Sequence, residues 1–313
     1  MISSKVSEIK KIKNLIKKSK RGQILIHTSP DGDAVASATA FYRVIRKLTK
    51  RSYHLFCPGP IPQRYRFITH SSQFRSTPIR SSLSIVLDTA GFSRLPGWKP
   101  EGVIVNIDHH DSNPGFGDIN IIKPESSSTV EILMEIFDAW EVRLDRTTAN
   151  ILYAGLFTET GGFIFRNTKA SSLTNAGRLV RVGASPQAIS QSVNRQTVGR
   201  LRLLGLVLSS LKINNGVAIL SVPYLFFTKT HTSIIDTEGF VETPLAIPGV
   251  KVSVLLKELK DGRIKVSLRS KGNINVNRIA QKFGGGGHRN AAGVIIDQPL
   301  QVVKRRILKG IRS

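Results

Sequence analysis

Three short apolar segments in the first half of the chain each run directly into acidic or imidazole side chains. They are residues 23–26, followed by His27, Asp31 and Asp33; residues 84–87, followed by Asp88; and residues 103–107, followed by Asp108, His109 and His110. Runs of branched apolar residues of this length are typical of strands buried in a parallel sheet. In an open α/β sheet, ligands bind outside the carboxyl ends of the strands. One such ending is equally well explained by a turn, but three on separate strands predict a site.

The rest of the chain predicts a two-domain α/β protein. Apolar residues at helical spacing predict helices over residues 5–19, 34–48, 127–141 and 145–157, and further helical segments between 171 and 211. After residue 214 the pattern changes to strands, predicted at residues 216–222, 250–258 and 263–269, with a hairpin turn at 260–262. We therefore expect a doubly wound parallel α/β domain over residues 1–190, a helical connector over 191–214 and a smaller mixed α/β domain over 215–313. A cleft between the two domains would hold the active site.

The chain carries a large excess of positive charge. It has 46 Lys and Arg residues against 21 Asp and Glu residues, a net charge of +25. Such an excess attracts nucleic acid, nucleotides, anionic lipid or acidic partners, although a basic, solvated surface is an alternative explanation. The single cysteine, Cys57, excludes an intrachain disulfide. No apolar stretch is long enough for a membrane span, and the Lys-rich start lacks the apolar core of a signal peptide, so we expect a cytoplasmic protein.

The ionisable side chains at the strand ends have the composition of a metal site. The candidate ligands share carboxylate or imidazole donors and lack thiolates: His27, Asp31, Asp33, Asp88, Asp108, His109, His110 and Glu159. This donor chemistry suits Mn²⁺ or Mg²⁺ better than structural zinc. One ion cannot use five or six protein ligands and still leave room for water and substrate, whereas two ions that share a bridging carboxylate can. The sequence therefore predicts two divalent ions, Mn²⁺ with Mg²⁺ as the alternative.

The order of these segments resembles the DHH phosphoesterase family. Its four motifs match HTSPDGDA, VLDTA, NIDHHDSN and FTETGGF, which lie between about residues 20 and 170. The segment SLRSKGNINVNRIAQKFGGGGHRNAAG resembles the family's DHH-associated C-terminal domain, expected over about 215–313. A lone DHH triplet is a weak signal, but the ordered set with this tail is specific. Length and tail are most similar to the oligoribonuclease (nanoRNase) branch, many of whose members also dephosphorylate pAp, and the tail does not resemble that of the related inorganic pyrophosphatases.

The resemblance implies a role for each candidate residue. His27 and Asp31 would hold one ion, Asp33 and His109 the other, and Asp88 would bridge them. His110 would lie near the scissile phosphate, and Asp108 would support the histidines. Glu159 stands where the family usually has an Asp ligand of the second ion, and Ala36 stands where a Gly is common. In the tail, Arg269 and His288 would bind the terminal phosphate of the substrate, while the glycine loop with Gly286, Gly287 and Arg289 lets backbone amides approach an anion.

These roles predict a Mn²⁺-dependent phosphodiesterase and phosphomonoesterase. We expect it to hydrolyse short RNA oligonucleotides to mononucleotides, and pAp to AMP. Within enzymes, the alternative is a cyclic di-AMP or linear-dinucleotide phosphodiesterase. From another class, the alternative is a catalytically weak nucleic-acid-binding protein, which the net charge and Glu159 would fit. The expected partners are oligoribonucleotides, dinucleotides or pAp and no membrane, and the sequence leaves a homodimer open.

Overall fold

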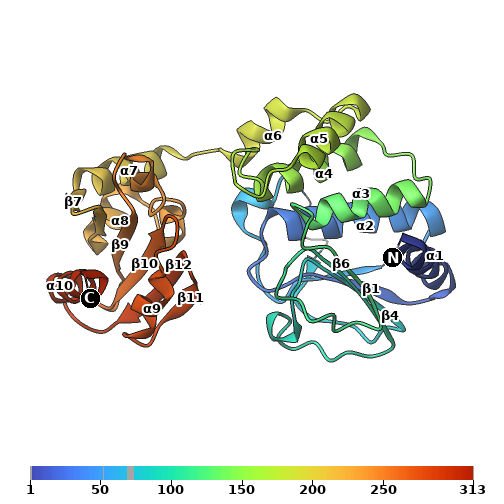
Figure 1. Ribbon diagram of the computed structural model, residues 1–313, viewed down its shortest axis with the longest axis horizontal. Helices are drawn as coiled ribbons and strands as arrows, with labels where there is room; N and C mark the ends of the chain where they lie inside the picture. The colour runs from blue at the N-terminus through green and yellow to red at the C-terminus, as the bar shows by residue number, and fades with distance from the viewer. Residues whose placement is uncertain (1, 52, 69–73, 313) are drawn as a thin grey trace. The chain divides into compact units, whose positions relative to one another are not determined.

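The computed structural model describes residues 2–51, 53–68 and 74–312, which form two compact units (Figure 1). The first unit comprises residues 1–195 and the second residues 196–313. The segment predicted as a helical connector, residues 191–214, is divided between them, because residues 196–214 belong to the second unit. None of the helices in the described ranges is long and apolar enough to cross a lipid bilayer.

The first unit contains a six-stranded, fully parallel sheet. In sheet order its strands are β3 (Phe74–Arg75), β2 (His54–Phe56), β1 (Gly22–Leu25), β4 (Leu83–Leu87), β5 (Val103–Asp108) and β6 (Ile119–Ile122). The residues of β1 and β4 are all buried, which explains the continuous apolar runs in the sequence. The strand order reverses between β1 and β4, and at such a reversal an open sheet places its ligand site at the strands' carboxyl ends. The predicted parallel sheet is confirmed.

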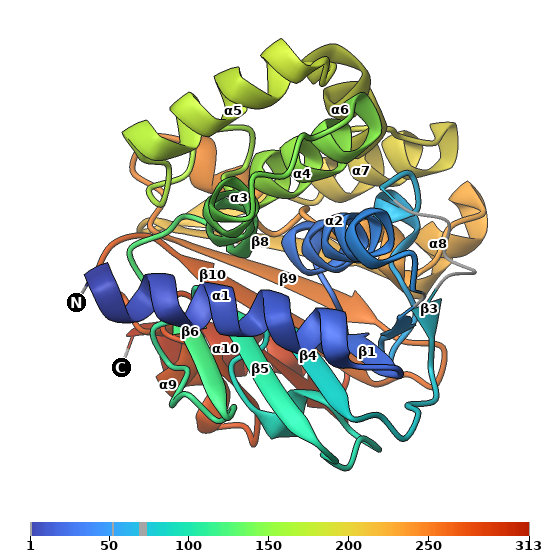
Figure 2. The same cartoon turned by 90° about the vertical axis from the view of Figure 1, so that its right-hand side faces the viewer.

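Helices cover one face of this sheet (Figure 2). The unit contains α1 (Ile2–Lys18), α2 (Gly32–Thr49), α3 (Thr129–Ala139), α4 (Arg146–Glu159), α5 (Ala170–Val182) and α6 (Pro186–Val193). A doubly wound sheet has helices on both faces, but the other face of this sheet is covered by side chains of connecting segments. There Leu95 and Trp98 pack on Leu25 and Val86. The short 3-10 helix η3 (Phe92–Arg94) directly precedes Leu95.

Small residues allow α2 and α4 to pack closely. A Cβ atom on Gly32 would lie 2.1 Å from the Thr158 hydroxyl oxygen, and one on Gly155 would lie 2.6 Å from the Ala36 methyl group. Ala36 is therefore accommodated at the position where the resemblance implies that Gly is common, because Gly155 opposite it has no side chain. This contact brings the first turn of α2 next to the last turns of α4.

Adding a methyl group at Gly155 should destabilise the protein. Gly155→Ala would place a Cβ against Ala36 and Val130, and such overpacking costs about 1–3 kcal/mol. The matched control is Gly177→Ala in α5, where a Cβ meets no atom within 4 Å. Ala has the higher helix propensity, so the control should be more stable by up to about 1 kcal/mol. Denaturant unfolding measures both free energies, and a stabilised Gly155→Ala variant would contradict the close packing.

The second unit is a smaller α/β domain, as predicted, and it contains a mixed six-stranded sheet. In sheet order its strands are β11 (Gly286–His288), β12 (Ala291–Ile296), β10 (Ile264–Ser270), β9 (Val252–Glu258), β8 (Val217–Val222) and β7 (Lys212–Asn214). Only β8 and β9 pair in parallel among the described strands of this sheet. Its helices are α7 (Val198–Ser209), α8 (Tyr224–Thr230), α9 (Val276–Gln281) and α10 (Leu300–Arg312). α9 and α10 pack on one face of the sheet, and α7 and α8 pack on the other.

Candidate metal centre

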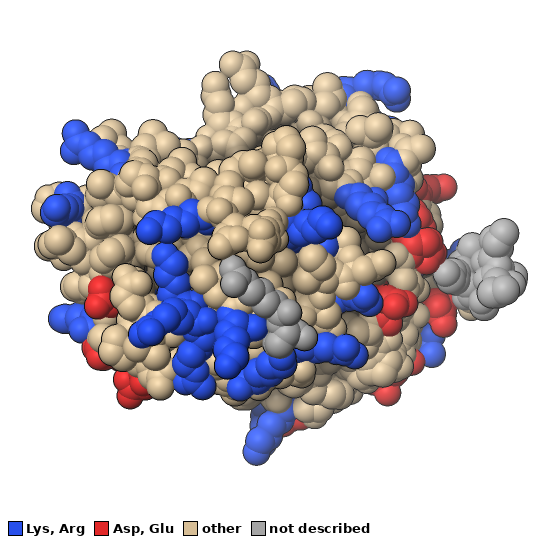
Figure 3. Space-filling view, turned by 60° about the vertical axis from the view of Figure 1, so that its left-hand side comes forward, with Lys and Arg blue, Asp and Glu red and all other residues tan. Residues whose placement is uncertain are grey.

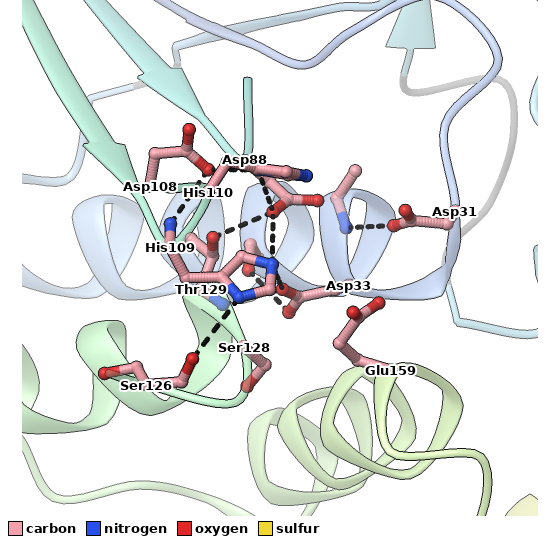
Figure 4. Close-up of polar contacts among 12 residues, drawn as sticks. Asp31, Asp33, Asp88, Asp108, His109, His110, Ser126, Ser128, Thr129 and Glu159 are labelled. Carbon is pink, nitrogen blue, oxygen red and sulfur yellow. Dashed lines mark hydrogen bonds and ion pairs between the residues drawn. The ribbon is translucent and has the colours of Figure 1, made fainter. Parts of the chain in front are cut away.

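The acidic and imidazole side chains converge at the carboxyl ends of β1, β4 and β5 (Figure 4). Asp88 directly follows β4, and Asp108 is the last residue of β5. Two sets of three side chains have donor atoms that all lie within 4.8 Å of one another. One set is His27, Asp31 and Asp88, and the other is Asp88, His109 and His110. Asp88 belongs to both sets, so it occupies the place that a bridging ligand needs.

Without a cation, both the backbone conformation of Asp88 and the ionised form of its carboxyl group are energetically unfavourable. Its backbone adopts a left-handed conformation with φ of 52°, and the residue is 1% exposed. Oδ1 accepts a hydrogen bond of 2.9 Å from the Thr129 hydroxyl, but Oδ2 has no hydrogen-bond partner among the described residues. Burial, followed by the charges of Asp33 and Asp31, raises the pKa of Asp88 well above its ordinary value. A buried carboxylate oxygen without a donor fits a metal ligand.

His27 and His109 each leave one ring nitrogen available to the carboxylates. His27 Nδ1 lies 2.7 Å from the Thr28 carbonyl oxygen, and His109 Nδ1 lies 3.4 Å from the Ser126 carbonyl oxygen. A carbonyl only accepts, so Nδ1 donates and the Nε2 lone pair is free. His27 Nε2 lies 4.0 Å from Asp88 Oδ2, and His109 Nε2 lies 3.6 Å from Asp88 Oδ1. Burial lowers the pKa of both imidazoles, which favours the neutral form that binds metals.

Asp31 and Asp33 are positioned by the starts of two helices. Asp31 Oδ1 caps α2 by accepting the Ala34 N–H at 3.0 Å, while its Oδ2 lies 3.9 Å from His27 Nε2. Asp33 accepts the backbone N–H groups of Thr129 and Val130, at 2.6 and 3.1 Å. Asp33 Oδ2 also lies 4.0 Å from His109 Nε2. The first turn of α3 therefore fixes the Asp33 carboxylate next to the second donor set.

Asp108 and His110 form a separate, tightly bonded pair. His110 Nδ1 lies 2.7 Å from Asp108 Oδ1, and the Asn113 amide donates to Asp108 Oδ2 at 2.6 Å. The Asp108 hydrogen bond is the main cause of a raised His110 pKa. Burial alone would raise the pKa of Asp108, but the hydrogen bond and charge of His110 hold it below its ordinary value. His110 is thus favoured as an imidazolium with a partly exposed side chain.

Glu159 lies beside the two donor sets but belongs to neither. It is the last residue of α4, and its carboxylate extends toward Asp31 and Asp33 (Figure 4). Burial, followed by the charges of Asp33 and Asp31, raises its pKa to about 9. A cation among these three carboxylates would offset the part of the shift that the charges of Asp33 and Asp31 cause.

Adding a divalent cation should stabilise the protein more at pH 8.5 than at pH 7. Burial and nearby carboxylates raise the pKa of Asp33 to about 7 and that of Glu159 to about 9. In the unfolded chain both carboxyl groups have already lost their protons at about pH 7. As pH rises above 7, only the folded state still has protons to release from these groups, so the metal-free protein loses stability. Melting temperatures with and without Mg²⁺ measure the effect. Glu159→Gln should reduce the difference between the two pH values, and an equal Mg²⁺ effect at both would contradict the expectation.

Sequence reasoning missed several residues that support this centre. Thr129 was predicted only as part of a helix start, yet it contacts both Asp33 and Asp88. Asn113 lies inside the NIDHHDSN segment, so its fixed spacing was an available signal. Arg94 Nη2 lies 2.6 Å from His27 Nδ1. A guanidinium only donates, so this contact requires that Nδ1 of His27 accepts, whereas the Thr28 carbonyl requires that Nδ1 donates. The two contacts therefore need opposite tautomers. The tautomer that bonds to Thr28 is the one that leaves the Nε2 lone pair free.

Comparison with known proteins identifies the family. The DHH family, N-terminal domain, matches residues 23–156, and the DHHA1 domain matches residues 217–311. A protein of Thermus thermophilus named bifunctional oligoribonuclease and PAP phosphatase NrnA is 31% identical, over 93% of this chain and 89% of its own length. The chain belongs to the DHH family. A Bacillus subtilis protein of the same name is 28% identical, over 86% of this chain and 87% of its own length.

A solved structure supports the same assignment. It is that of an exopolyphosphatase-related protein from Bacteroides fragilis, which is 26% identical to this DHH protein and matches it with a TM-score of 0.89. The match covers 98% of this chain and 96% of that one. The predicted family and the predicted two-domain α/β fold are therefore confirmed.

The tail residues lie in the second unit of the DHH protein. Arg269, on β10, donates from Nε to Glu242 Oε1 at 2.8 Å, and Arg289 Nη2 donates to the Asn273 carbonyl oxygen at 3.0 Å. The predicted glycine loop is a strand over residues 286–288, because β11 pairs with β12. A Cβ on Gly287 would lie 2.4 Å from the Ala291 carbonyl oxygen, which explains the glycine there. The side chain of His288 lies outside the described part of the structure.

Proposed function

We propose that this DHH protein is a metal-dependent phosphoesterase that hydrolyses short RNA oligonucleotides to mononucleotides, and pAp to AMP. The observation that carries the proposal is the pair of donor sets that share Asp88. Two relatives named bifunctional oligoribonuclease and PAP phosphatase support the substrate class. In the face drawn in Figure 3, Lys and Arg side chains gather with few acidic side chains among them, which favours the approach of an anionic substrate.

In this proposal His27 and Asp31 would hold one ion, Asp33 and His109 would hold the other, and Asp88 would serve both. Glu159 contributes a further carboxylate beside Asp33. Carboxylate and imidazole donors suit Mn²⁺, with Mg²⁺ as the alternative. When bound, such ions lower the pKa of water and polarise a phosphoryl oxygen.

His110 and Asp108 act on protons in this proposal. Nδ1 of His110 donates to Asp108, so Nε2 of the imidazolium can donate to a phosphoryl oxygen or to the leaving oxygen. Asp108, which also accepts from Asn113, orients the ring and favours its protonated form by raising the pKa of His110. His110 would thus be the general acid, and Asp108 its positioning residue.

The second unit contributes phosphate recognition in this proposal, through Arg269, Gly286, Gly287, His288 and Arg289. Recognition of a terminal phosphate would limit the enzyme to short substrates. Glu242 must release Arg269, or share it, when a phosphate binds.

Removing the Arg269 charge should weaken the binding of end-phosphorylated substrates. For Arg269→Gln we expect KM to rise about tenfold or more, because one charge-assisted contact is lost, with little change in kcat. Arg263→Gln is a matched control, since this arginine also pairs with a carboxylate, Asp261, in the same unit. Steady-state kinetics on a 5′-phosphorylated dinucleotide measure both constants. An unchanged KM in Arg269→Gln would exclude the role.

Turnover of four substrates tests the proposed function. The purified chain is assayed with a dinucleotide, a five-residue RNA, pAp and cyclic di-AMP, in Mn²⁺, in Mg²⁺ and in EDTA. We expect hydrolysis of the first three, and none in EDTA. Turnover confined to cyclic di-AMP would replace the proposal by a cyclic-dinucleotide phosphodiesterase. RNA binding without hydrolysis in saturating Mn²⁺ would replace it by a nucleic-acid-binding protein.

A further inference from the structure

A cavity of about 820 Å³ lies in the first unit, away from the metal centre. Its walls come from the second half of α2, the start of α4, α6 and the segment at residues 142–145. The lining residue Arg43 follows Asp33 by ten positions on α2. At 1.5 Å per residue that separation is about 15 Å along the helix. None of the residues assigned above to metal or phosphate binding lines the cavity.

The cavity wall is strongly cationic. Its charged members are six basic side chains and one acidic side chain: Arg43, Arg46, Lys47, Arg66, Arg143, Arg146 and Asp145. Asp145 accepts the Thr148 N–H at 2.7 Å and pairs with Arg43 at 3.4 Å. Asp145 is therefore already paired with Arg43, and it does not compensate the charges of the other five basic side chains.

Five of the six basic side chains have no carboxylate partner within the described ranges: Arg46, Lys47, Arg66, Arg143 and Arg146. Lys47 donates instead to the Arg143 carbonyl oxygen at 2.8 Å. Arginine is well suited to bind phosphate, because its planar guanidinium offers paired donors. The helix α4 also begins in this wall, at Arg146, and the positive end of a helix dipole lies at its first turn. A phosphorylated anion would match this charge.

Two aromatic rings line the same cavity. Phe67 is 41% exposed, and the Tyr42 ring lies 5.7 Å from the guanidinium carbon of Arg46. Aromatic faces stack on nucleobases with little sequence preference. Inorganic phosphate needs neither a ring nor this volume, whereas ligand sites for small organic molecules span about 300–1,000 Å³.

We propose that this cavity is a second ligand site, which binds a nucleotide with its phosphate at the arginines that lack a carboxylate partner and its base against Tyr42 and Phe67. The site is independent of the metal centre and of the proposed hydrolytic activity. A nucleoside without phosphate, or phosphate without a base, would use only half of it.

Calorimetric titration of the full chain in EDTA tests the site, with AMP, adenosine and inorganic phosphate as probes. We expect AMP to bind about tenfold or more tightly than either fragment, because charged hydrogen bonds and stacking each add free energy. Arg46→Gln with Arg143→Gln should weaken AMP binding about tenfold or more. Tyr42→Leu should weaken AMP binding and leave phosphate binding unchanged.

Two control variants separate this site from general charge and from the other sites. Lys99→Gln with Lys260→Gln removes two exposed charges elsewhere, and Asp88→Asn with Arg269→Gln alters the residues assigned to metal and phosphate. The lysine double should bind AMP like the parent chain, and the Asp88 and Arg269 double should keep the AMP binding that the Arg46 and Arg143 substitutions weaken. The proposal is overturned if AMP does not bind to the parent chain. It is also overturned if the Lys99 and Lys260 double weakens AMP binding as much as the Arg46 and Arg143 double, or if only the Asp88 and Arg269 double weakens it. Circular dichroism verifies that each variant is folded.

Discussion

Asp88→Asn should abolish hydrolysis while leaving the metal-free protein at least as stable as the parent. The substitution keeps the size of the side chain but removes the one carboxylate that both donor sets share. In the proposed two-ion site, loss of the Asp88 charge should lower kcat by about a thousandfold or more, since electrostatic stabilisation at such centres contributes several kcal/mol. Metal content, measured by mass spectrometry, should fall in parallel.

The stability expectation follows from the state of Asp88 without metal. Its carboxyl is fully buried, one oxygen has no hydrogen-bond partner in the part of the chain described, and its pKa is raised well above the ordinary value by burial and by neighbouring carboxylates. An uncharged amide avoids the cost of ionising that position at neutral pH. The melting temperature in EDTA should therefore not fall. A variant that is inactive because it is unfolded is thereby distinguished from one that lacks its metals.

Asp111→Asn is the matched control for Asp88→Asn. Asp111 follows His110 in the same motif but is exposed and belongs to neither donor set. It should keep both its activity and its metal content. Substantial turnover by Asp88→Asn, or full metal content in that variant, would contradict the shared-ligand assignment.

The sequence predicted the parts of this centre that depend on side-chain type and strand position. Asp88 and Asp108 are adjacent in space because β4 and β5 are parallel neighbours whose carboxyl ends meet. That arrangement follows from two apolar runs that end in aspartate. The parallel sheet, the second mixed sheet and the family were predictable for the same reason, since each depends on pattern and order along the chain.

The parts that were missed depend on contacts between distant segments. The backbone N–H groups of Thr129 and Val130 that bind Asp33 lie 96 and 97 positions away, and backbone donors leave no signature in residue types. The glycine run predicted a loop, but a Cβ on Gly285 would lie 2.4 Å from the Gly293 carbonyl oxygen, so close strand pairing explains the glycine there. The cavity beside α2 is formed by segments of α2, α4 and α6, and no local pattern predicts it.

His110→Gln should lower kcat by about a hundredfold or more while leaving most of the bound metal in place. General acid catalysis contributes about a hundredfold to ten-thousandfold, and glutamine cannot donate a proton as an imidazolium does. The alternative is that His110 is a metal ligand, because its donor atom lies in a set with Asp88 and His109. Metal content separates the two roles, since a ligand role requires that it falls together with kcat.

Asp108→Asn tests whether Asp108 acts through His110. The variant loses the negative charge of the group that lies 2.7 Å from His110 Nδ1, and with it the cause of the raised His110 pKa, so kcat should fall by about tenfold or more. In the His110→Gln background the same substitution should cost little more, because the group through which it acts is gone. Fully additive losses in kcat would assign Asp108 a role of its own, through its bond from the His109 N–H at 2.9 Å. Metal content near that of the parent in all three variants would place this pair in proton transfer and leave metal binding to the ligands proposed above.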